Sequence, residues 1–432
     1  MRELGASDKY FYYTSSGKGS TMDIRLPITF KSPVNREALI VATSEALRLY
    51  PEFSAQPVLK DERLFYEENH NPVALLPLSS RYDFGTDDMN GYLFCFQIDP
   101  SDERKVVFSV YHGLSDWNGL SRFIKAIICR YAVYVKGLPD DYFNAVIRSH
   151  APSKDEWETQ INLNPYDVYG KQGIMPSYKP EITSEIFSPS EDFYGFDYPS
   201  ARHIRLTLSV SQFIKTAKSH NTSFVPFLLY LSSNTIREAY NTDKTILTML
   251  PVDLRRVFNT DCIVNFSDSA FLPSSIEQHE APLEEQCRRF REMITLTRKP
   301  ENYAGFLYDK AQTVKNFELS PIVQKAYENT SQTAEILKLV THGITYPGIM
   351  DMPEGADDLI ENIVMDSPFG VSLVLVTTYH DEMSITSIQR FDSDRLVKAF
   401  CGKLSTVGLD VKITYNELVE QNVMNLERLK RV

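Results

Sequence analysis

The chain has 432 residues, of which 43% are hydrophobic and 24% charged, and its formal net charge is −12. This length exceeds one ordinary domain and suits two lobes of about 200 residues each. The acidic balance disfavours nucleic acid and anionic membrane surfaces as partners, because both are negatively charged.

Two further features predict a cytoplasmic protein without a metal site. Residues 1–10 lack the basic-then-apolar order of a signal peptide, and the longest apolar stretches, such as residues 224–231, are far shorter than a membrane span. The five cysteines show no C-x-x-C spacing. We therefore expect thiols packed in a core, and neither a zinc site nor a disulfide framework.

The first half of the chain is expected to open with a half-buried strand, because residues 22–30 alternate between apolar and polar side chains. The pattern then predicts a helix over 34–50, short strands over 55–59 and 63–67, strands over 92–98 and 105–111, and a helix over 120–135 that ends near Gly137.

The second half repeats this order. We expect a strand over 203–210, helices over 212–219 and 224–240, a strand over 245–252, a strand pair over 370–379 and 383–390, and a helix over 392–406. In both halves a strand and a helix come first, and a strand pair later closes onto a helix. The corresponding strands even end alike, in Tyr111-His112 and Tyr379-His380. The pattern indicates two copies of one α/β sandwich unit, at 1–185 and 186–432, connected through the Pro- and Tyr-rich segment 140–198.

One strand end carries residues suited to proton transfer. Residues 106–123 read VVFSVYHGLSDWNGLSRF, so that an apolar strand runs into His112 and Asp116 follows four residues later. Histidine is the side chain best suited to accept a proton near neutral pH. The alternative is purely structural: a histidine that closes a strand and an aspartate that caps the next helix.

A second segment favours the catalytic interpretation. Residues 249–266 read MLPVDLRRVFNTDCIVNF, an apolar strand that ends in Pro-Val-Asp-Leu-Arg-Arg and is followed by Asn265 and Phe266. An H-x-x-x-D loop in the first half, with this segment in the second, resembles the chloramphenicol-acetyltransferase-like acyltransferase superfamily. It is similar to the fused two-lobe members, namely alcohol acetyltransferases, plant BAHD acyltransferases and nonribosomal peptide condensation domains. The resemblance implies two lobes, each a mixed β-sheet flanked by helices, with a channel between them.

The resemblance also implies roles for individual residues. His112, Asp116 and Asn265 form the predicted catalytic set. His112 would take the proton of an acceptor hydroxyl or amine that attacks a thioester carbonyl, and Asn265 would help to hold the oxyanion. Asp116 would be structural and pair with an arginine, with Arg255 as the first candidate and Arg256 as the second.

The sequence departs from the family pattern at two positions that shape the channel. Many relatives have a second histidine where this chain has Tyr111, and many have glycine where it has Trp117. Gly119 retains the later glycine of the motif. An indole at position 117 would crowd the channel or reshape the acceptor pocket.

The leading functional hypothesis is an acyltransferase that uses acyl-CoA as co-substrate and a small hydroxyl or amine acceptor, with no bound cofactor. Two alternatives stay open: a catalytically silent binding or scaffold protein, and a stand-alone condensation enzyme that uses carrier-bound acyl groups. A monomer is expected, because two fused lobes can replace the subunit contact of single-lobe relatives.

Overall fold

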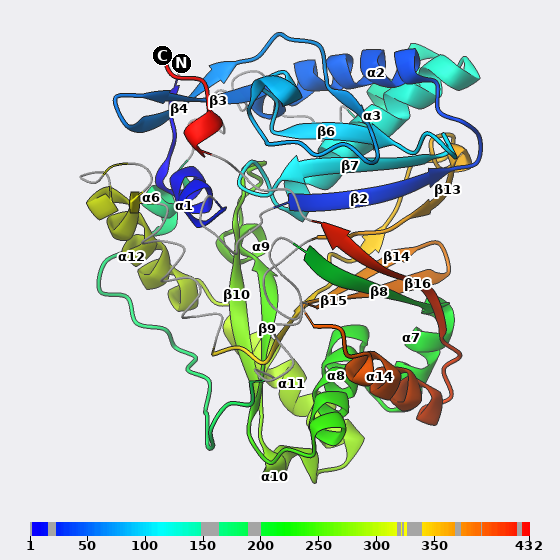
Figure 1. The fold of residues 1–432 in the computed structure, drawn as a ribbon. Coiled ribbons are helices and arrows are strands. Elements are labelled where there is room, and N and C mark those ends of the chain that lie inside the picture. Colours follow the sequence, from blue (N-terminus) through cyan, green and yellow to red (C-terminus); the bar gives the residue numbers. More distant parts are fainter. Residues whose placement is uncertain are drawn as a thin grey trace.

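Two β-sheets, one above the other in Figure 1, organise the chain, and each is flanked by helices. The computed structural model describes residues 2–15, 23–147, 164–188, 200–317, 321, 324–325, 339–367, 373–389, 391–420 and 426–432. The predicted α/β fold of two lobes, each with a mixed sheet and helices, is confirmed.

The upper sheet belongs to the N-terminal lobe. Its five strands, in the order β13-β2-β7-β6-β5, are Ile360–Ile363, Asp23–Phe30, Lys105–Tyr111, Phe94–Ile98 and Leu75–Pro77. The β5–β6 pair is parallel, whereas the other pairs are antiparallel. The alternation in β2 sets its register, because its even-numbered residues are buried and Phe30 packs edge-on against Tyr131 of α3.

Helices α2 (Arg36–Leu49) and α3 (Trp117–Lys136) pack on each other beside this sheet (Figure 1). The Asn35 side chain begins α2 by accepting a hydrogen bond from the Ala38 amide at 3.0 Å. Gly137, with φ of 64°, ends α3 in the left-handed conformation that glycine adopts without strain. Both predicted helices are therefore present, with ends shifted by up to three residues.

A small sheet lies at the outer edge of the same lobe. Its strands, in the order β1-β4-β3, are Arg2–Glu3, Arg63–Glu68 and Ala55–Lys60, and η1 (Pro51–Ser54) precedes them. Residues 426–432, which include η4 (Leu426–Arg428), run beside β3, because the Leu59 amide donates to the Lys430 carbonyl at 2.9 Å. Residues from the two ends of the sequence thus meet in one lobe.

The lower sheet belongs to the C-terminal lobe and has eight strands in the described part of the chain. In the order β10-β9-β11-β14-β15-β8-β16, they are Ser267–Ser274, Ile246–Asp253, His342–Thr345, Leu373–Tyr379, Glu382–Gln389, Ser200–Ser209 and Lys412–Glu420, and β12 (Ile349–Met350) pairs with β14. Strand β11 is parallel to β9 and β14, whereas β14, β15, β8 and β16 form antiparallel pairs.

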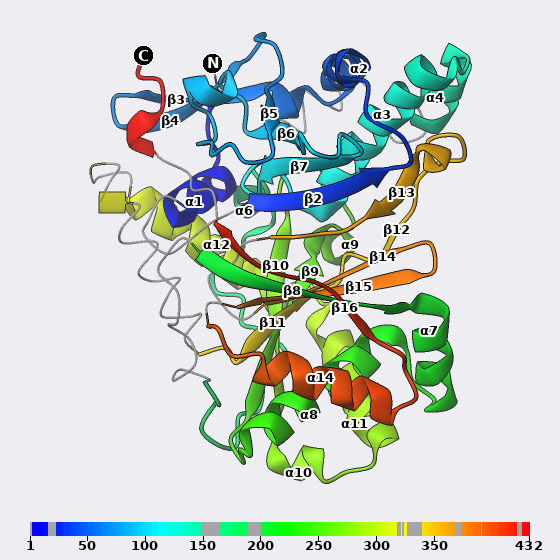
Figure 2. The ribbon, with the colours of Figure 1, turned by 45° about the vertical axis from the view of Figure 1, so that its right-hand side comes forward.

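Helices cover the side of this sheet that faces away from the upper lobe, as Figure 2 shows for α7, α8, α11 and α14. They span Val210–Ser219, Phe224–Tyr240, Leu283–Thr297 and Arg395–Thr406. The remaining helical segments are α1 (Ala6–Ser15), η2 (Asp87–Met89), α4 (Asp140–Ile147), α6 (Pro165–Tyr169), α9 (Leu254–Phe258), α10 (Ile276–His279), α12 (Glu301–Phe317) and η3 (Asp357–Leu359). The predicted elements of the second half are present, although residues 370–372 and 390 of the predicted strand pair lie outside the described residues.

The two lobes exchange segments. Strand β13 follows the C-terminal lobe in sequence but pairs with β2 in the upper sheet, and α1 at the start of the chain packs against α12. The predicted connection over 140–198 contains the short helices α4 and α6, and its residues 148–163 and 189–198 lie outside the described part. The division at residue 185 stays a prediction.

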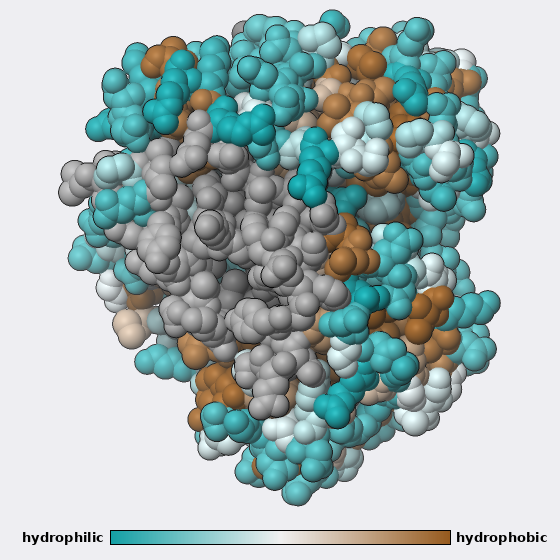
Figure 3. Space-filling view, in the orientation of Figure 1, coloured by the Kyte–Doolittle hydropathy of each residue, from teal (hydrophilic) through white to brown (hydrophobic). Residues whose placement is uncertain are grey.

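The described surface in Figure 3 is mainly hydrophilic, with scattered hydrophobic patches between polar side chains. Four of the five cysteines are buried and Cys401 is half-buried, and all five are free thiols. Among the described helices, none combines the length and apolar character needed to cross a membrane.

Candidate active site

His112 lies directly after β7, where the strand leaves the upper sheet and turns toward α3. Its side chain is half-buried. The Nδ1 atom is 3.2 Å from the Ser115 carbonyl oxygen and 2.9 Å from Asn265 Nδ2. Asn265 Nδ2 also donates a hydrogen bond to the His112 carbonyl oxygen at 2.7 Å. Residues from both lobes therefore hold one edge of the imidazole.

The opposite edge of the ring carries Nε2. Within the described residues, the hydrogen bonds of the His112 side chain involve only Nδ1. Burial lowers the pKa of His112 below its ordinary value of 6.5, and this effect outweighs the nearby carbonyl groups and the Asp116 carboxylate, which favour the protonated form. At neutral pH the imidazole is thus uncharged, as a proton acceptor must be.

The turn after His112 requires a residue without a side chain. A Cβ atom on Gly113 would lie 2.3 Å from the Tyr111 ring, closer than any real contact. Tyr111 itself is buried, and its ring packs edge-on against Tyr12 at 4.8 Å between centroids. The glycine therefore lets the chain fold back over Tyr111 and present His112 at the strand end.

Asp116 connects the histidine loop to the other lobe. Its Oδ1 accepts a hydrogen bond from the Asn118 amide at 3.1 Å, so the side chain caps the start of α3. Its Oδ2 accepts from Arg255 Nη1 at 2.6 Å and from the Phe266 amide at 2.8 Å. One buried carboxylate thus fixes a helix of the N-terminal lobe onto the C-terminal lobe.

Arg255 is the arginine that the structure pairs with Asp116. Although burial disfavours its charged form, the Asp116 carboxylate raises the pKa of Arg255 above its ordinary value. Its Nη2 also donates to the Val264 carbonyl at 2.6 Å, so the guanidinium holds the loop that leads to Asn265. The neighbouring Arg256 is 84% exposed and lies 3.5 Å from Asp253.

The two motif segments touch directly at a second place. Ser115 Oγ donates to the Ile263 carbonyl at 2.7 Å. A Cβ atom on Gly119 would lie 2.2 Å from that same carbonyl oxygen and 2.2 Å from Ser115 Oγ. Gly119 therefore permits the first turn of α3 to rest against the 260–266 loop. Trp117, the first residue of α3, is half-buried and packs against the hydrophobic core.

Helix α1 lies beside this loop. The sequence motifs did not predict that residues of α1 contribute to the site. The Phe11 ring stacks on the His112 imidazole, with centroids 5.5 Å apart and an interplanar angle of 24°. The only sequence signal was the aromatic run Tyr10 to Tyr13 (YFYY), whose partners lie far away in the chain.

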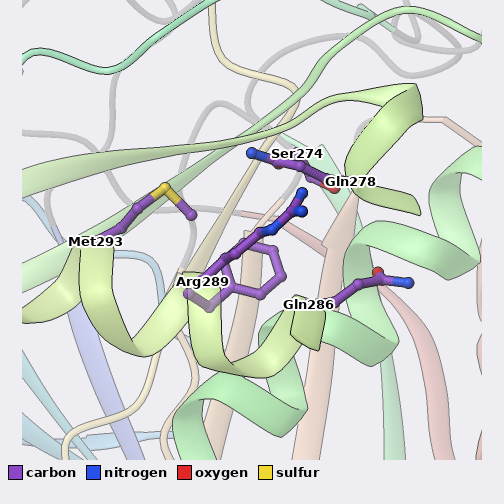
Figure 4. A pocket seen from close by; sticks show the side chains of 6 residues that line it. Ser274, Gln278, Gln286, Arg289 and Met293 are labelled. Carbon is purple, nitrogen blue, oxygen red and sulfur yellow. The ribbon is translucent and has the colours of Figure 1, made fainter. Parts of the chain in front are cut away.

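The described part of the chain contains no group of three or more His, Cys, Asp or Glu side chains placed to share a metal ion. A small surface pocket lies elsewhere, in the C-terminal lobe between α10, α11 and the end of β10 (Figure 4). Ser274 in its lining is the last residue of β10, whereas Asn265 lies just before the first residue of that strand, so the pocket is at the other end of the strand from His112. The residues that line this pocket are Ser274, Gln278, Gln286, Arg289, Phe290 and Met293.

Neither a family model nor a curated protein matches the sequence, but solved structures match its fold over nearly the whole chain. TRI101 of F. sporotrichioides, solved with coenzyme A and T-2, superposes with a TM-score of 0.55 at 12% identity and covers 95% of this chain and 99% of its own. The TRI3 trichothecene 15-O-acetyltransferase of Fusarium sporotrichioides gives 0.59 at 12% identity, with 94% of each chain covered. The condensation domain of the Monacolin K polyketide synthase MokA gives 0.57 at 12%, covering 94% of this chain and 96% of that domain. The chain therefore has the two-lobed fold of chloramphenicol-acetyltransferase-like acyltransferases and condensation domains.

Proposed function

We propose that this protein transfers an acyl group from a thioester, with acyl-CoA as the donor, to a hydroxyl or amine acceptor, and that His112 is the general base. The observation that carries the proposal is the arrangement around His112: an uncharged imidazole at a strand end, with Ser115 at Nδ1, Asn265 of the other lobe on the His112 carbonyl, and Nε2 outside these contacts.

The hydrogen bonds at Nδ1 bear on which ring nitrogen can act as the base. The Ser115 carbonyl can only accept a hydrogen bond, so it is satisfied when Nδ1 carries the proton. Asn265 Nδ2 directs its hydrogen bond at the His112 carbonyl, so with the proton on Nδ1 its 2.9 Å approach to Nδ1 is a contact between two donors and not a hydrogen bond. On this ground we assign the neutral tautomer with the proton on Nδ1, which leaves a lone pair on Nε2.

In the proposed reaction Nε2 takes the proton of the acceptor O–H or N–H while the acceptor atom attacks the thioester carbonyl carbon. The tetrahedral intermediate carries an oxyanion, and its collapse breaks the carbon–sulfur bond. The departing thiolate of coenzyme A then receives the proton from the imidazolium. The histidine is regenerated, and the products are an ester or amide and free coenzyme A.

The partners of His112 have positioning roles in this proposal. Asp116 and Arg255 fix the loop across the lobe boundary, and Asn265 holds the backbone and the Nδ1 edge of His112. The participation of Asn265 in binding the oxyanion stays a prediction, because its Nδ2 contacts are directed at His112.

The donor and acceptor classes rest on the matched folds. TRI101 was solved with coenzyme A and the small molecule T-2, and TRI3 is an acetyltransferase by name, which favours a CoA thioester and a small acceptor. The match to a condensation domain keeps a carrier-bound acyl group as the second candidate donor.

The test is an acyl-CoA consumption screen against pooled alcohols and amines, with free thiol measured by Ellman's reagent and products identified by mass spectrometry. We expect the wild type to form product. In His112→Ala the rate should fall by at least about 100-fold. His380→Ala is the matched control, because it removes the exposed histidine at the corresponding strand end. Unchanged turnover in a folded His112→Ala protein would contradict the proposed mechanism.

A further inference from the structure

Helix α1 connects both lobes to the end of β7. Its four consecutive aromatic residues each face a different partner. Tyr10 contacts Tyr166 of α6 and Lys310 of α12, Phe11 contacts His112, Tyr12 contacts Tyr111, and Tyr13 contacts Phe317 of α12. Figure 1 shows α1 beside α6 and α12, below the small sheet of the N-terminal lobe.

The contact between Phe11 and His112 is a stack of one ring face on another. The centroid distance of 5.5 Å and the angle of 24° correspond to an offset arrangement, which aromatic rings prefer over direct superposition. Both side chains are half-buried. The phenyl ring therefore lies against one face of the imidazole.

We propose that Phe11 is a positioning residue for His112, and that it fixes the plane of the imidazole so that Nε2 points toward the acceptor. This inference rests on the proposed function, because it assigns the orientation of the same base. The contacts with Ser115 and Asn265 hold only the Nδ1 edge, about which the ring can still tilt. A flat side chain against one face prevents that tilt, and small errors in the position of a catalytic group are costly to the rate.

The backbone of α1 is itself anchored, so Phe11 has a defined position. Lys310 Nζ lies 5.0 Å from the centroid of the Tyr10 ring and 3.2 Å from Asp268 Oδ2, with only 14% and 9% of the Lys310 and Asp268 side chains exposed. On the other side of Phe11, the buried Tyr12 packs against Tyr111. The neighbours of Phe11 in sequence are thus held by the C-terminal lobe and by the strand that carries His112.

Two substitutions separate the aromatic face from bulk. Phe11→Leu removes the flat ring and keeps an apolar side chain, whereas Phe11→Tyr keeps the ring. Phe187→Leu is the matched control, because it makes the same chemical change at another half-buried ring, which packs on Tyr240 at the end of α8. The His112→Ala protein provides the baseline for transfer.

Two measurements are made on each variant. The first is kcat and KM for the acyl-CoA and acceptor pair found in the screen. The second is the rate at which diethyl pyrocarbonate modifies His112 at pH 7, followed by mass spectrometry of the tryptic peptide 106–122, in which His112 is the only histidine. The second measurement needs no knowledge of the substrate.

We expect Phe11→Leu to lower kcat about tenfold with KM changed less than about twofold, and to speed the modification of His112 about threefold or more by uncovering its ring. Phe11→Tyr should restore both values, and Phe187→Leu should change neither. The inference is overturned if Phe11→Leu leaves both measurements within twofold of the wild type, or if Phe11→Tyr is as impaired as Phe11→Leu.

The two failures are distinguishable. If transfer depends on His112 but neither measurement responds to Phe11→Leu, the proposed function stands and the role of Phe11 is refuted. If transfer is unchanged in His112→Ala while the modification rate follows the aromatic character of residue 11, the stacking contact stands and the proposed role of His112 in acyl transfer is refuted.

Discussion

The strands β7 and β14 end in the same dipeptide, Tyr-His, yet the two histidines have opposite surroundings. After His112 the chain turns through Gly113 toward α3, whose first turn rests on the other lobe. After Tyr379 it turns back at once, because Tyr379 pairs with Glu382 across a two-residue hairpin in which His380 has φ of 51°.

The two imidazoles also use different nitrogens. His380 places Nε2 against Asp357 Oδ2 at 2.8 Å, and the Tyr379 hydroxyl donates to the other oxygen of this carboxylate at 2.6 Å. His112 uses Nδ1 for its contacts, and its stacking partner Phe11 comes from another element of the fold. A strand-end histidine is therefore suited to catalysis only where the following segment and the opposite lobe hold the ring by the correct edge.

Each histidine lies near a carboxylate, Asp116 for His112 and Asp357 for His380. The largest effect on stability is expected when Asp116 is replaced. Asp116→Asn preserves a good helix cap but removes the nearer of the two carboxylates that pair with the buried Arg255, leaving only Asp253 Oδ1 at 3.3 Å from Nη1. The free energy of unfolding should therefore fall by up to about 3–5 kcal/mol. Asp357→Asn removes the partner of the exposed His380 and should cost less than about 1 kcal/mol. Urea denaturation of both variants measures the difference.

Equal losses in the two variants would show that the Asp116–Arg255 pair does not join the lobes as the structure indicates. Arg256→Gln serves as a control for charge alone, because that side chain is 84% exposed and its removal should have little effect.

A smaller effect is expected at the helix that follows each strand pair, since both helices contain a glycine. Gly119→Ala would place a methyl group against the Ile263 carbonyl and should destabilise the fold by about 1–3 kcal/mol. Gly402→Ala in α14 meets no atom within 4 Å and should stabilise it by about 0.5–1 kcal/mol, because alanine favours helix. Thermal unfolding of the two proteins tests the contrast, and a stabilising Gly119→Ala substitution would refute the close contact between lobes.

The sequence allowed the prediction of the elements that local periodicity defines. The strand before His112, the helix after it and the strand pair of the C-terminal lobe all have clear apolar patterns, and the structure contains them. The sequence left two candidates, Arg255 and Arg256, for the partner of Asp116, because the motif does not show which of two adjacent arginines points inward. In the structure, α9 directs Arg255 toward Asp116 and Arg256 toward solvent. Spacing alone could not show this.

The contacts that complete the site are long-range and were beyond local patterns. Phe11 meets His112 across 101 positions, and Asn265 meets it across 153. Long-range contacts of this kind depend on how the lobes pack.

Helix α11 was also missed. Its buried residues Cys287, Phe290 and Ile294 recur on one face, but charged residues dominate the sequence between them and obscure the apolar pattern.

The smallest expected effect concerns the pH dependence of transfer. Burial lowers the pKa of His112 from its ordinary value of 6.5, so the imidazole is half-protonated only at a pH below 6.5. We therefore expect the midpoint of the acid limb of kcat/KM to lie below pH 6.5, because the base is lost as it is protonated. The same shift affects stability in a defined direction. The unfolded chain binds the proton first as the pH falls, so this histidine makes the folded state less stable below pH 6.5. The pH–rate profile, together with a titration of ¹³C-labelled histidine assigned through His112→Gln, measures both quantities. His380→Ala should leave the acid limb unchanged, whereas an acid limb at or above pH 6.5 in the wild type would show that His112 is not the buried base.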